Sequence, residues 1–477
     1  MNAYDVIVIG GGAAGMFAAV QAGYAGAKVL LLEPNERLGK KLYITGKGRC
    51  NLTNNCSWQE VLKNVPTNPR FLYSALSGYT PEDTITFFES HGCETKTERG
   101  NRVFPVSDKS ASVVDALKTA LGYAGVEVRR ARALEILRQG NRTPEAEASQ
   151  NCHCETSPQT GRGNPHLPSP VASGGRSVTA PAACHVTGVR TDKGDFSAPA
   201  VILATGGRSY PATGSTGDGY RLAKALGHSV VPPVGSLVPL VEDGPWCAKM
   251  QGLALRNINV RLYEASADPT VGTSIACPRT SDARPYSQAS GKPIFEEFGE
   301  LLFTHFGLSG PVILSASAHM EQGKTYIIEI DLKPALDEAT LDARILRDFG
   351  AAQNRSFENA LSGLYPKTMI PVMVARSGIP GDTKVNSVTR EQRRALLELT
   401  KHFTVEISGR RPVEEAIVTS GGVSTNEINP KTMESKLVPG LYFAGEVMDV
   451  DAYTGGFNLQ IAWSTAYAAA AAAAGNK

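Results

Sequence analysis

The chain has 477 residues, 42% of them hydrophobic, and its 48 Lys and Arg residues nearly balance 46 Asp and Glu residues. This length and composition predict a globular enzyme of two or three domains, and the balanced charge argues against a protein that binds nucleic acid through a basic surface. The eight cysteines form no Cys-x-x-Cys pair and no signal sequence opens the chain, so we expect a cytoplasmic protein without a disulfide framework.

The opening of the chain predicts a strand–helix–strand unit that binds a dinucleotide. The apolar run Val6–Ile9 is typical of a strand buried in a parallel sheet. In the motif that follows, Gly10 permits a tight turn, Gly12 lets backbone amides approach a pyrophosphate, and Gly15 lets a helix pack closely on the strand. A second strand ends in Glu33, which can accept hydrogen bonds from a ribose. NAD and FAD both meet these requirements, so the unit leaves both open.

Two later segments are predicted to return to this site. Residues 45–51 form a basic, glycine-rich loop that can run past the phosphates, although a solvated basic turn is the alternative. Residues 199–207 form an apolar strand that ends in Ala-Thr-Gly, where small residues permit close approach of a cofactor. Within the first loop, Cys50 is either a redox thiol or, as we prefer, a small packed residue, because no second cysteine is placed to resolve it.

Two polar stretches, residues 139–183 and 265–292, are predicted to be insertions. The first contains a Cys-His-Cys sequence at residues 152–154, which raises the question of a metal site. Its spacing fits no standard zinc pattern, so we expect a solvated loop and no bound metal.

The end of the chain narrows the dinucleotide to FAD. Residues 440–444 predict one more buried strand, and Glu446 follows it closely enough to reach the ribityl hydroxyls of a flavin, a group that NAD lacks. Gly455 and Gly456 then begin a helix whose N-terminal amides can face the isoalloxazine ring, where reduced flavin carries negative charge. The alternative is a glycine turn before an ordinary packed helix, which leaves Glu446 unexplained. The alanines of that helix are too weakly lipophilic, and too interrupted by polar residues, to predict a membrane span.

Six segments occur in an order that carries a family resemblance: GKGRCNLTN (46–54), NRVFPVSDKSASVVDAL (101–117), ATGGRSYPATGSTGDGYRLAKALGH (204–228), HFGLSGPVILSAS (305–317), VTSGGVSTNEINPKTMESK (418–436) and GEVMDVDAYTGGFNLQIAWSTA (445–466). The chain resembles a bacterial flavoprotein family that includes aminoacetone oxidase and a dehydro-bile-acid reductase. The resemblance implies an α/β fold: a Rossmann-like, glutathione-reductase-like FAD-binding domain with an inserted β-barrel-like domain and a small helical domain. The implied division is an FAD-binding domain of residues 1–138, 184–229 and 426–477, a polar insertion loop of 139–183, a β-rich substrate domain of 230–333 and 401–425, and a helical subdomain of 334–400.

The resemblance also implies which residues contact FAD. Tyr453 stands where we expect a glycine in versions of the last motif, so it puts the shape of the substrate site in doubt. The implied contacts are Gly10, Gly12, Ala13, Ala14, Gly15, Glu33, Pro34, Lys40, Gly48, Arg49, Cys50, Asn51, Leu134, Ala204, Thr205, Gly206, Gly445, Glu446, Gly456, Phe457, Asn458, Leu459, Gln460 and Ile461.

The sequence therefore predicts an FAD-dependent oxidoreductase that passes a hydride between flavin N5 and a small organic substrate. We favour reduction of an activated C=C in a steroid-like molecule or enone, with NAD(P)H as the candidate electron donor, and oxidation of an amine or aminoketone by molecular oxygen is the alternative. A flavin-dependent RNA-modifying enzyme and a flavin redox sensor without turnover are alternatives from other classes. We expect neither a nucleic-acid nor a membrane partner. No catalytic acid or base follows from the sequence, although Tyr453 and His305 are candidates.

Overall fold

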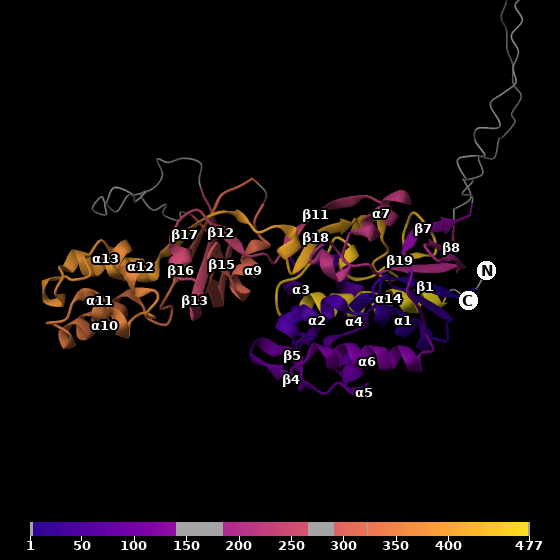
Figure 1. Cartoon of the computed structure of the whole chain (residues 1–477), viewed down its shortest axis with the longest axis horizontal. Coiled ribbons are helices and arrows are strands. Elements are labelled where there is room, and N and C mark those ends of the chain that lie inside the picture. Colours follow the sequence, from indigo (N-terminus) through magenta and orange to yellow (C-terminus); the bar gives the residue numbers. More distant parts are fainter. Residues whose placement is uncertain (1–2, 140–184, 266–290, 322, 476–477) are drawn as a thin grey trace, which may run out of the picture.

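A computed structural model describes residues 3–139, 185–265, 291–321 and 323–475. The predicted insertions, and the Cys-His-Cys sequence at 152–154, lie almost wholly outside the described residues. The described part is elongated, with a six-stranded barrel between a Rossmann-type α/β unit and a small group of helices (Figure 1).

A five-stranded parallel sheet is the centre of the α/β unit. Its first strand, β1, is fully buried and pairs with β2 on one side and β10 on the other, which explains its uninterrupted apolar sequence. Because all strands are parallel, the loops that follow β1, β10 and β19 emerge at one edge of the sheet. The strand order is β19 (Leu441–Phe443), β10 (Ala200–Leu203), β1 (Val6–Ile9), β2 (Val29–Leu32) and β6 (Glu127–Arg129).

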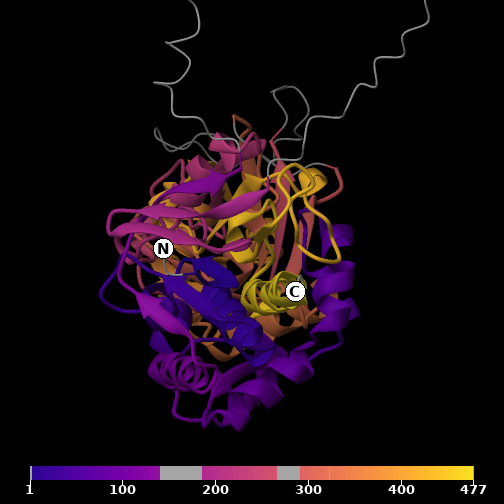
Figure 2. The ribbon, with the colours of Figure 1, turned by 90° about the vertical axis from the view of Figure 1, so that its right-hand side faces the viewer.

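Helices and smaller sheets surround this sheet. The C-terminal helix lies beside the N-terminal segment in the interior of the unit (Figure 2). The helices are α1 (Ala13–Tyr24), α2 (Lys40–Ile44), α3 (Trp58–Lys63), α4 (Tyr73–Gly78), α5 (Pro81–Ser90), α6 (Ser110–Tyr123), α7 (Asp218–Ala225) and α14 (Phe457–Gly475). The smaller sheets are β3 (Thr53–Asn54), β5 (Arg102–Pro105) and β4 (Thr95–Glu98); β7 (Ala133–Arg138), β8 (Val186–Thr191) and β9 (Gly194–Ser197); and β11 (Val230–Ser236) with β18 (Val418–Val423).

Small side chains on α14 allow its close packing against α1. Ala466, Ala469 and Ala470 are buried completely, and Trp463 is buried among them with its Nε1 donating to the Leu52 carbonyl at 2.9 Å. A large side chain in place of these alanines would hold the two helices apart. The alanine-rich run is therefore a core helix, and no helix in the described part of the chain is long and apolar enough to cross a membrane.

The barrel and the distal helices share a second hydrophobic core. Its buried residues run from Leu240 to Ile407, whereas the first core draws on residues 4–226 and 423–474. We propose the predicted discontinuous division with one change. Strands β11 and β18 pair with each other outside the barrel and contact α7, so we assign them to the α/β unit. The closed barrel consists of β12 (Leu240–Glu242), β15 (Gly307–Ser309), β14 (Phe295–Phe303), β13 (Ala254–Glu264), β16 (Tyr326–Asp331) and β17 (Phe403–Arg410), with α8 (Trp246–Lys249) and α9 (Pro311–Ser317); the distal helices are α10 (Glu338–Ala351), α11 (Phe357–Ala360), α12 (Ile370–Ser377) and α13 (Arg390–Lys401).

The predicted fold class is confirmed: a Rossmann-type α/β unit with an inserted barrel and a helical subdomain.

Candidate functional site

The glycine motif after β1 divides into structural and accessible positions. A Cβ on Gly15 would lie 1.7 Å from the Gly10 carbonyl oxygen, and a Cβ on Gly10 would lie 2.5 Å from the Ala204 carbonyl oxygen. Gly12 is the N-cap of α1, and a Cβ on it would meet nothing within 4 Å. Gly10 and Gly15 therefore permit packing, while Gly12 leaves open space at a helix N-terminus, where backbone amides attract phosphate.

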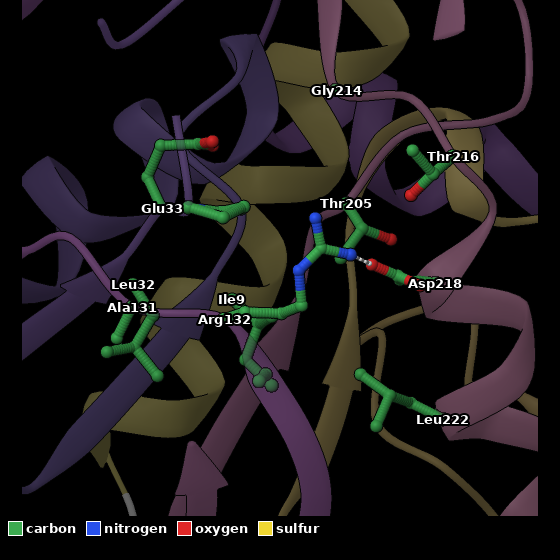
Figure 3. Close-up of a pocket in the computed structure, with 13 residues that line it drawn as sticks. Ile9, Leu32, Glu33, Ala131, Arg132, Thr205, Gly214, Thr216, Asp218 and Leu222 are labelled. Carbon is green, nitrogen blue, oxygen red and sulfur yellow. Dashed lines mark hydrogen bonds and ion pairs between the residues drawn. The ribbon is translucent and has the colours of Figure 1, made fainter. Parts of the chain in front are cut away.

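Glu33 lies in a pocket at the carboxyl ends of β1 and β2. Its carboxylate accepts hydrogen bonds from the Gly11 amide at 2.7 Å and from the Asn35 amide at 2.8 Å. Across the pocket, Arg132 Nη1 pairs with Asp218 Oδ2 at 2.8 Å (Figure 3). The lining consists of Ile9, Gly10, Leu32, Glu33, Pro34, Ala131, Arg132, Ala133, Thr205, Gly214, Thr216, Asp218 and Leu222.

This lining differs in detail from the predicted contacts. Leu134 is 41% exposed and does not line the pocket, whereas its neighbour Ala133 does. Arg132 and Asp218 were not predicted, because one lies in an irregular segment and the other begins a helix after a loop, and neither position stands out in the sequence. Both become neighbours only through the fold of the chain around the sheet edge.

Three buried oxygen atoms have no hydrogen-bond partner among the described residues: Thr205 Oγ1, Asn51 Oδ1 and Tyr220 Oη. Leaving a buried polar atom unpaired costs about 1–3 kcal/mol. Thr205 lines the pocket and Asn51 lies in the predicted cofactor loop, so both orphaned atoms fit a site that a polar ligand completes. Tyr220 does not line the pocket.

Three donors that come from distant parts of the chain hold the Glu446 carboxylate. Lys41 Nζ lies 2.8 Å from Oε2, Ser209 Oγ donates to Oε1 at 3.2 Å, and the Thr419 amide donates to Oε1 at 2.8 Å. Lys41 also lies 3.1 Å from Oε1. Lys41 is therefore the lysine that holds Glu446. The amine of Lys40, a predicted FAD contact, is exposed and lies near Asn35 and the Ala212 carbonyl.

Two side chains of the loop around Arg49 contact other parts of the protein. The Arg49 guanidinium lies 4.1 Å from the centre of the Phe104 ring and pairs with Glu98 and Asp108. The Arg49 side chain therefore already has two carboxylate partners before any cofactor contact is considered. Cys50 is completely buried, and this burial raises the pKa of its thiol to about 12, so the interpretation as a packed residue is favoured over a redox thiol.

The start of α14 is pressed against β3. A Cβ on Gly456 would lie 2.4 Å from the Thr53 carbonyl oxygen, and Asn54 Nδ2 donates to the Gly455 carbonyl at 3.0 Å. The glycines thus bring the start of this helix to the segment that directly follows Asn51. Glycine at residue 456 is required by this close approach, which is an additional reason for the glycine pair beyond the predicted flavin contact.

Several predicted contacts in α14 have side chains that serve the fold. Asn458 accepts from the Ala452 amide at 2.9 Å and donates to the Ala452 carbonyl at 2.6 Å, which fixes the loop before the helix. Gln460 is completely buried and accepts from Thr53 Oγ1 and Thr84 Oγ1 at 2.6 and 2.9 Å. Phe457 and Ile461 lie in the core, and Leu459 packs against it.

The two sequence candidates for a catalytic group lie in different environments. His305 is exposed on the hairpin between β14 and β15, beside the Phe306 ring. Tyr453 is half-buried, and its Oη lies 2.7 Å from His319 Nε2, just after α9 on the barrel. His319 was not predicted, because a single histidine near a helix end carries no motif.

Comparison with known proteins identifies the family. The model for the HI0933-like protein Rossmann domain matches residues 4–169 and 170–472. The chain belongs to this HI0933-like family. It is 31% identical over 471 residues to the ribosomal RNA dihydrouridine synthase of Escherichia coli strain K12, with 98% of each chain covered. It is 29% identical over 474 residues to the 3-dehydro-bile acid delta(4,6)-reductase of Clostridium scindens, again with 98% of each chain covered.

Solved structures are similar at lower identity. The 3-ketosteroid-delta4-(5alpha)-dehydrogenase of Rhodococcus jostii RHA1 is 14% identical, with a TM-score of 0.45 and coverage of 99% of this chain and 97% of that chain. A flavocytochrome c3 fumarate reductase in its open conformation is 16% identical, with a TM-score of 0.43 and coverage of 99% of this chain and 78% of that chain.

Membership of the HI0933-like family confirms the predicted class, an FAD-dependent oxidoreductase with a Rossmann-type domain. The individual FAD contacts stay predictions, as do the substrate and the electron donor. The open space at Gly12 and the orphaned oxygens of Thr205 and Asn51 fit the cofactor that the class requires.

Proposed function

We propose that this member of the HI0933-like family reduces a C=C conjugated with a carbonyl group, using FAD as the redox cofactor and NAD(P)H as the electron donor. Support comes from the two relatives that match over almost their whole length. A delta(4,6)-reductase acting on a 3-dehydro bile acid saturates C=C bonds conjugated with a ketone. Conversion of uridine to dihydrouridine saturates a C=C conjugated with a ring carbonyl.

The chain supplies the parts that such a reaction needs around FAD. In this proposal Gly12 and the N-terminus of α1 hold the pyrophosphate, Glu33 holds the adenosine ribose, and Glu446 holds the ribityl chain. The start of α14 favours negative charge on the reduced ring. When bound, FAD supplies a carrier that accepts and releases a hydride equivalent.

The relatives leave two substrate classes for this chemistry. A small enone or steroid-like molecule is our first choice and agrees with the near-neutral charge of the chain. A uridine in ribosomal RNA is the second candidate, because the match to the E. coli synthase covers 98% of both chains. The expectation that nucleic acid is no partner therefore stays a prediction.

Two half-reactions test the proposal. Anaerobic mixing of the FAD-loaded protein with NADH and then NADPH is expected to bleach the flavin absorbance. The reduced protein is then mixed with cyclohex-2-en-1-one, with a 4-en-3-one steroid, or with unmodified ribosomal RNA, and recovery of absorbance identifies the substrate class. Mass spectrometry of the product should show a gain of two hydrogens.

The same experiment detects the alternatives. Bleaching by an amine or aminoketone with rapid recovery in air would replace the proposal with an oxidase. A flavin that nicotinamides reduce but no C=C compound reoxidises would contradict it.

A further inference from the structure

A tyrosine and a histidine from different parts of the fold meet beside the predicted flavin end of the site. Tyr453 belongs to the loop before α14, and His319 follows α9 on the side of the barrel that faces the α/β unit (Figure 1). Tyr453 Oη and His319 Nε2 lie 2.7 Å apart. Their ring centres are 5.5 Å apart and the two rings are tilted by 34°.

The backbone of the tyrosine is fixed from both sides. The Tyr453 amide donates to the Asn64 carbonyl at 2.9 Å, and Asn458 holds the preceding residue, Ala452, through its amide and carbonyl. Two residues later, Gly455 accepts a hydrogen bond from Asn54. The Tyr453 side chain therefore starts from a loop that hydrogen bonds fix, next to the start of α14 and the segment after Asn51. Both are predicted to lie near the flavin ring.

The histidine is fixed on the barrel side by an aromatic neighbour. The ring of Phe295, the first residue of β14, lies 5.0 Å from the His319 ring and 6.5 Å from the Tyr453 ring. These three rings form one side of the junction between the barrel and the α/β unit. Both Tyr453 and His319 are half-buried.

The surroundings of the pair keep the Tyr453 phenol protonated and the His319 ring neutral. Burial raises the pKa of Tyr453, and the nearby carboxylates of Asp451 and Glu297 raise it further. Burial lowers the pKa of His319, which is therefore neutral at pH 7. A neutral imidazole with its proton on Nε2 donates to Oη and leaves the phenol O–H free to donate elsewhere. The Asp451 carboxylate accepts hydrogen bonds from Ser236 Oγ at 2.7 Å and from Ser420 Oγ at 3.0 Å.

We propose that Tyr453 is the catalytic proton donor of this enzyme. His319 is the positioning residue that orients the Tyr453 hydroxyl and returns a proton to it. The inference rests on the proposed function. Reduction of a conjugated C=C needs one hydride and one proton, and the hydride comes from FAD reduced by NAD(P)H. The Tyr453 O–H bond breaks and a C–H bond forms at the carbon next to the carbonyl. The tyrosinate then takes the Nε2 proton of His319, while Nδ1 takes a proton from water, so charge and atoms balance.

The test separates the two half-reactions in Tyr453→Phe, which keeps the ring and removes only Oη. Reduction by the active nicotinamide should be unchanged, whereas reoxidation by cyclohex-2-en-1-one, or by whichever C=C compound reoxidises the wild type, should slow by roughly 100- to 10,000-fold, the usual contribution of a general acid. His319→Gln, whose amide can still donate to Oη, should slow reoxidation less than His319→Ala, and both should change its pH profile. Tyr467→Phe is the matched control. Tyr467 lies in α14 and its ring stacks on the ring of Tyr79, so this variant should leave both rates unchanged.

A second readout needs no turnover. In the oxidised, substrate-free protein, 15N NMR should show that the imidazoles of His319 and His228 titrate below the usual range, and only the Nε2 resonance of His319 should shift in Tyr453→Phe. Unchanged reoxidation in Tyr453→Phe, with normal FAD content, would overturn the role of Tyr453 while the proposed function stands. A wild-type enzyme that no C=C compound reoxidises would overturn the proposed function and this role together.

Discussion

Lys41 Nζ lies 2.8 Å from Glu446 Oε2, and this ion pair joins residues that are 405 positions apart. Each side chain is about a quarter exposed or less, at 25% and 21%. The pair connects α2, soon after the glycine motif, to the loop that follows β19. The two parts of the predicted cofactor site, from the start and from the end of the chain, are therefore joined by an ion pair.

Glu446→Gln is expected to weaken FAD binding by roughly 10- to 100-fold. A hydrogen bond to a charged group is worth about 1.5–3 kcal/mol, and each 1.4 kcal/mol is tenfold in affinity. Fluorescence titration of the apoprotein with FAD measures the loss. Lys41→Met is the comparison variant: it removes the ion pair but leaves the carboxylate, so it should cost less affinity. Equal FAD affinity in Glu446→Gln and the wild type would refute the ribityl assignment.

Gly12→Ala and Gly15→Ala should fail for different reasons. A Cβ at Gly15 would lie 1.7 Å from the Gly10 carbonyl oxygen, so this variant should not give a stable fold. A Cβ at Gly12 meets nothing within 4 Å, so Gly12→Ala should keep the Tm of the apoprotein and lose most FAD affinity, because the methyl group occupies the approach of the pyrophosphate. Differential scanning fluorimetry with and without FAD distinguishes the two. Normal FAD binding by Gly12→Ala would place the phosphates elsewhere.

Thr205→Val tests whether an orphaned polar atom belongs to the cofactor site. The Thr205 hydroxyl is buried and has no hydrogen-bond partner in the described part of the chain, so its replacement by a methyl group should leave the apoprotein as stable or make it more stable by about 1–3 kcal/mol. If FAD supplies the missing hydrogen-bond partner of the Thr205 hydroxyl, the same variant should bind FAD more weakly by about tenfold. Urea unfolding and FAD titration give the two numbers. A stability loss without an affinity loss would show that the hydroxyl serves the fold.

The sequence predicted best where local physics determines the structure. The apolar run Val6–Ile9 and the glycines after it specify a buried strand, a turn and a helix within a short segment. Glu446 was predicted as a cofactor contact because an acid that follows a buried strand and a glycine is unusual. Lys41 and His319 were missed, because their roles depend on contacts with residues more than 100 positions away, which no local pattern encodes. The buried hydrogen bonds of Gln460 were also not predicted, since they join it to hydroxyls of Thr53 and Thr84 that lie far away in the sequence.

His228 should make the stability of the protein depend on pH. Its side chain is fully buried, with Nδ1 3.0 Å from Glu427 Oε2 and Nε2 2.8 Å from Ser435 Oγ. Burial lowers the pKa of His228 in the folded state despite the neighbouring carboxylate, whereas in the unfolded chain the pKa is about 6.5. Below that pH the unfolded state therefore binds a proton that the folded state does not.

The contribution of His228 is thus fully present above about pH 6.5 and is lost as the pH falls towards the lowered pKa of the folded state. One such group changes the free energy of unfolding by at most about 1.4 kcal/mol per pH unit. We expect His228→Gln to flatten the dependence of unfolding free energy on pH between 7 and 5, measured by urea denaturation at each pH. His305→Gln, at an exposed histidine, is the control and should retain the wild-type slope. The same slope in His228→Gln as in the wild type would mean that His228 binds its proton as readily in the folded protein as in the unfolded chain, and that the carboxylate of Glu427 cancels the effect of burial.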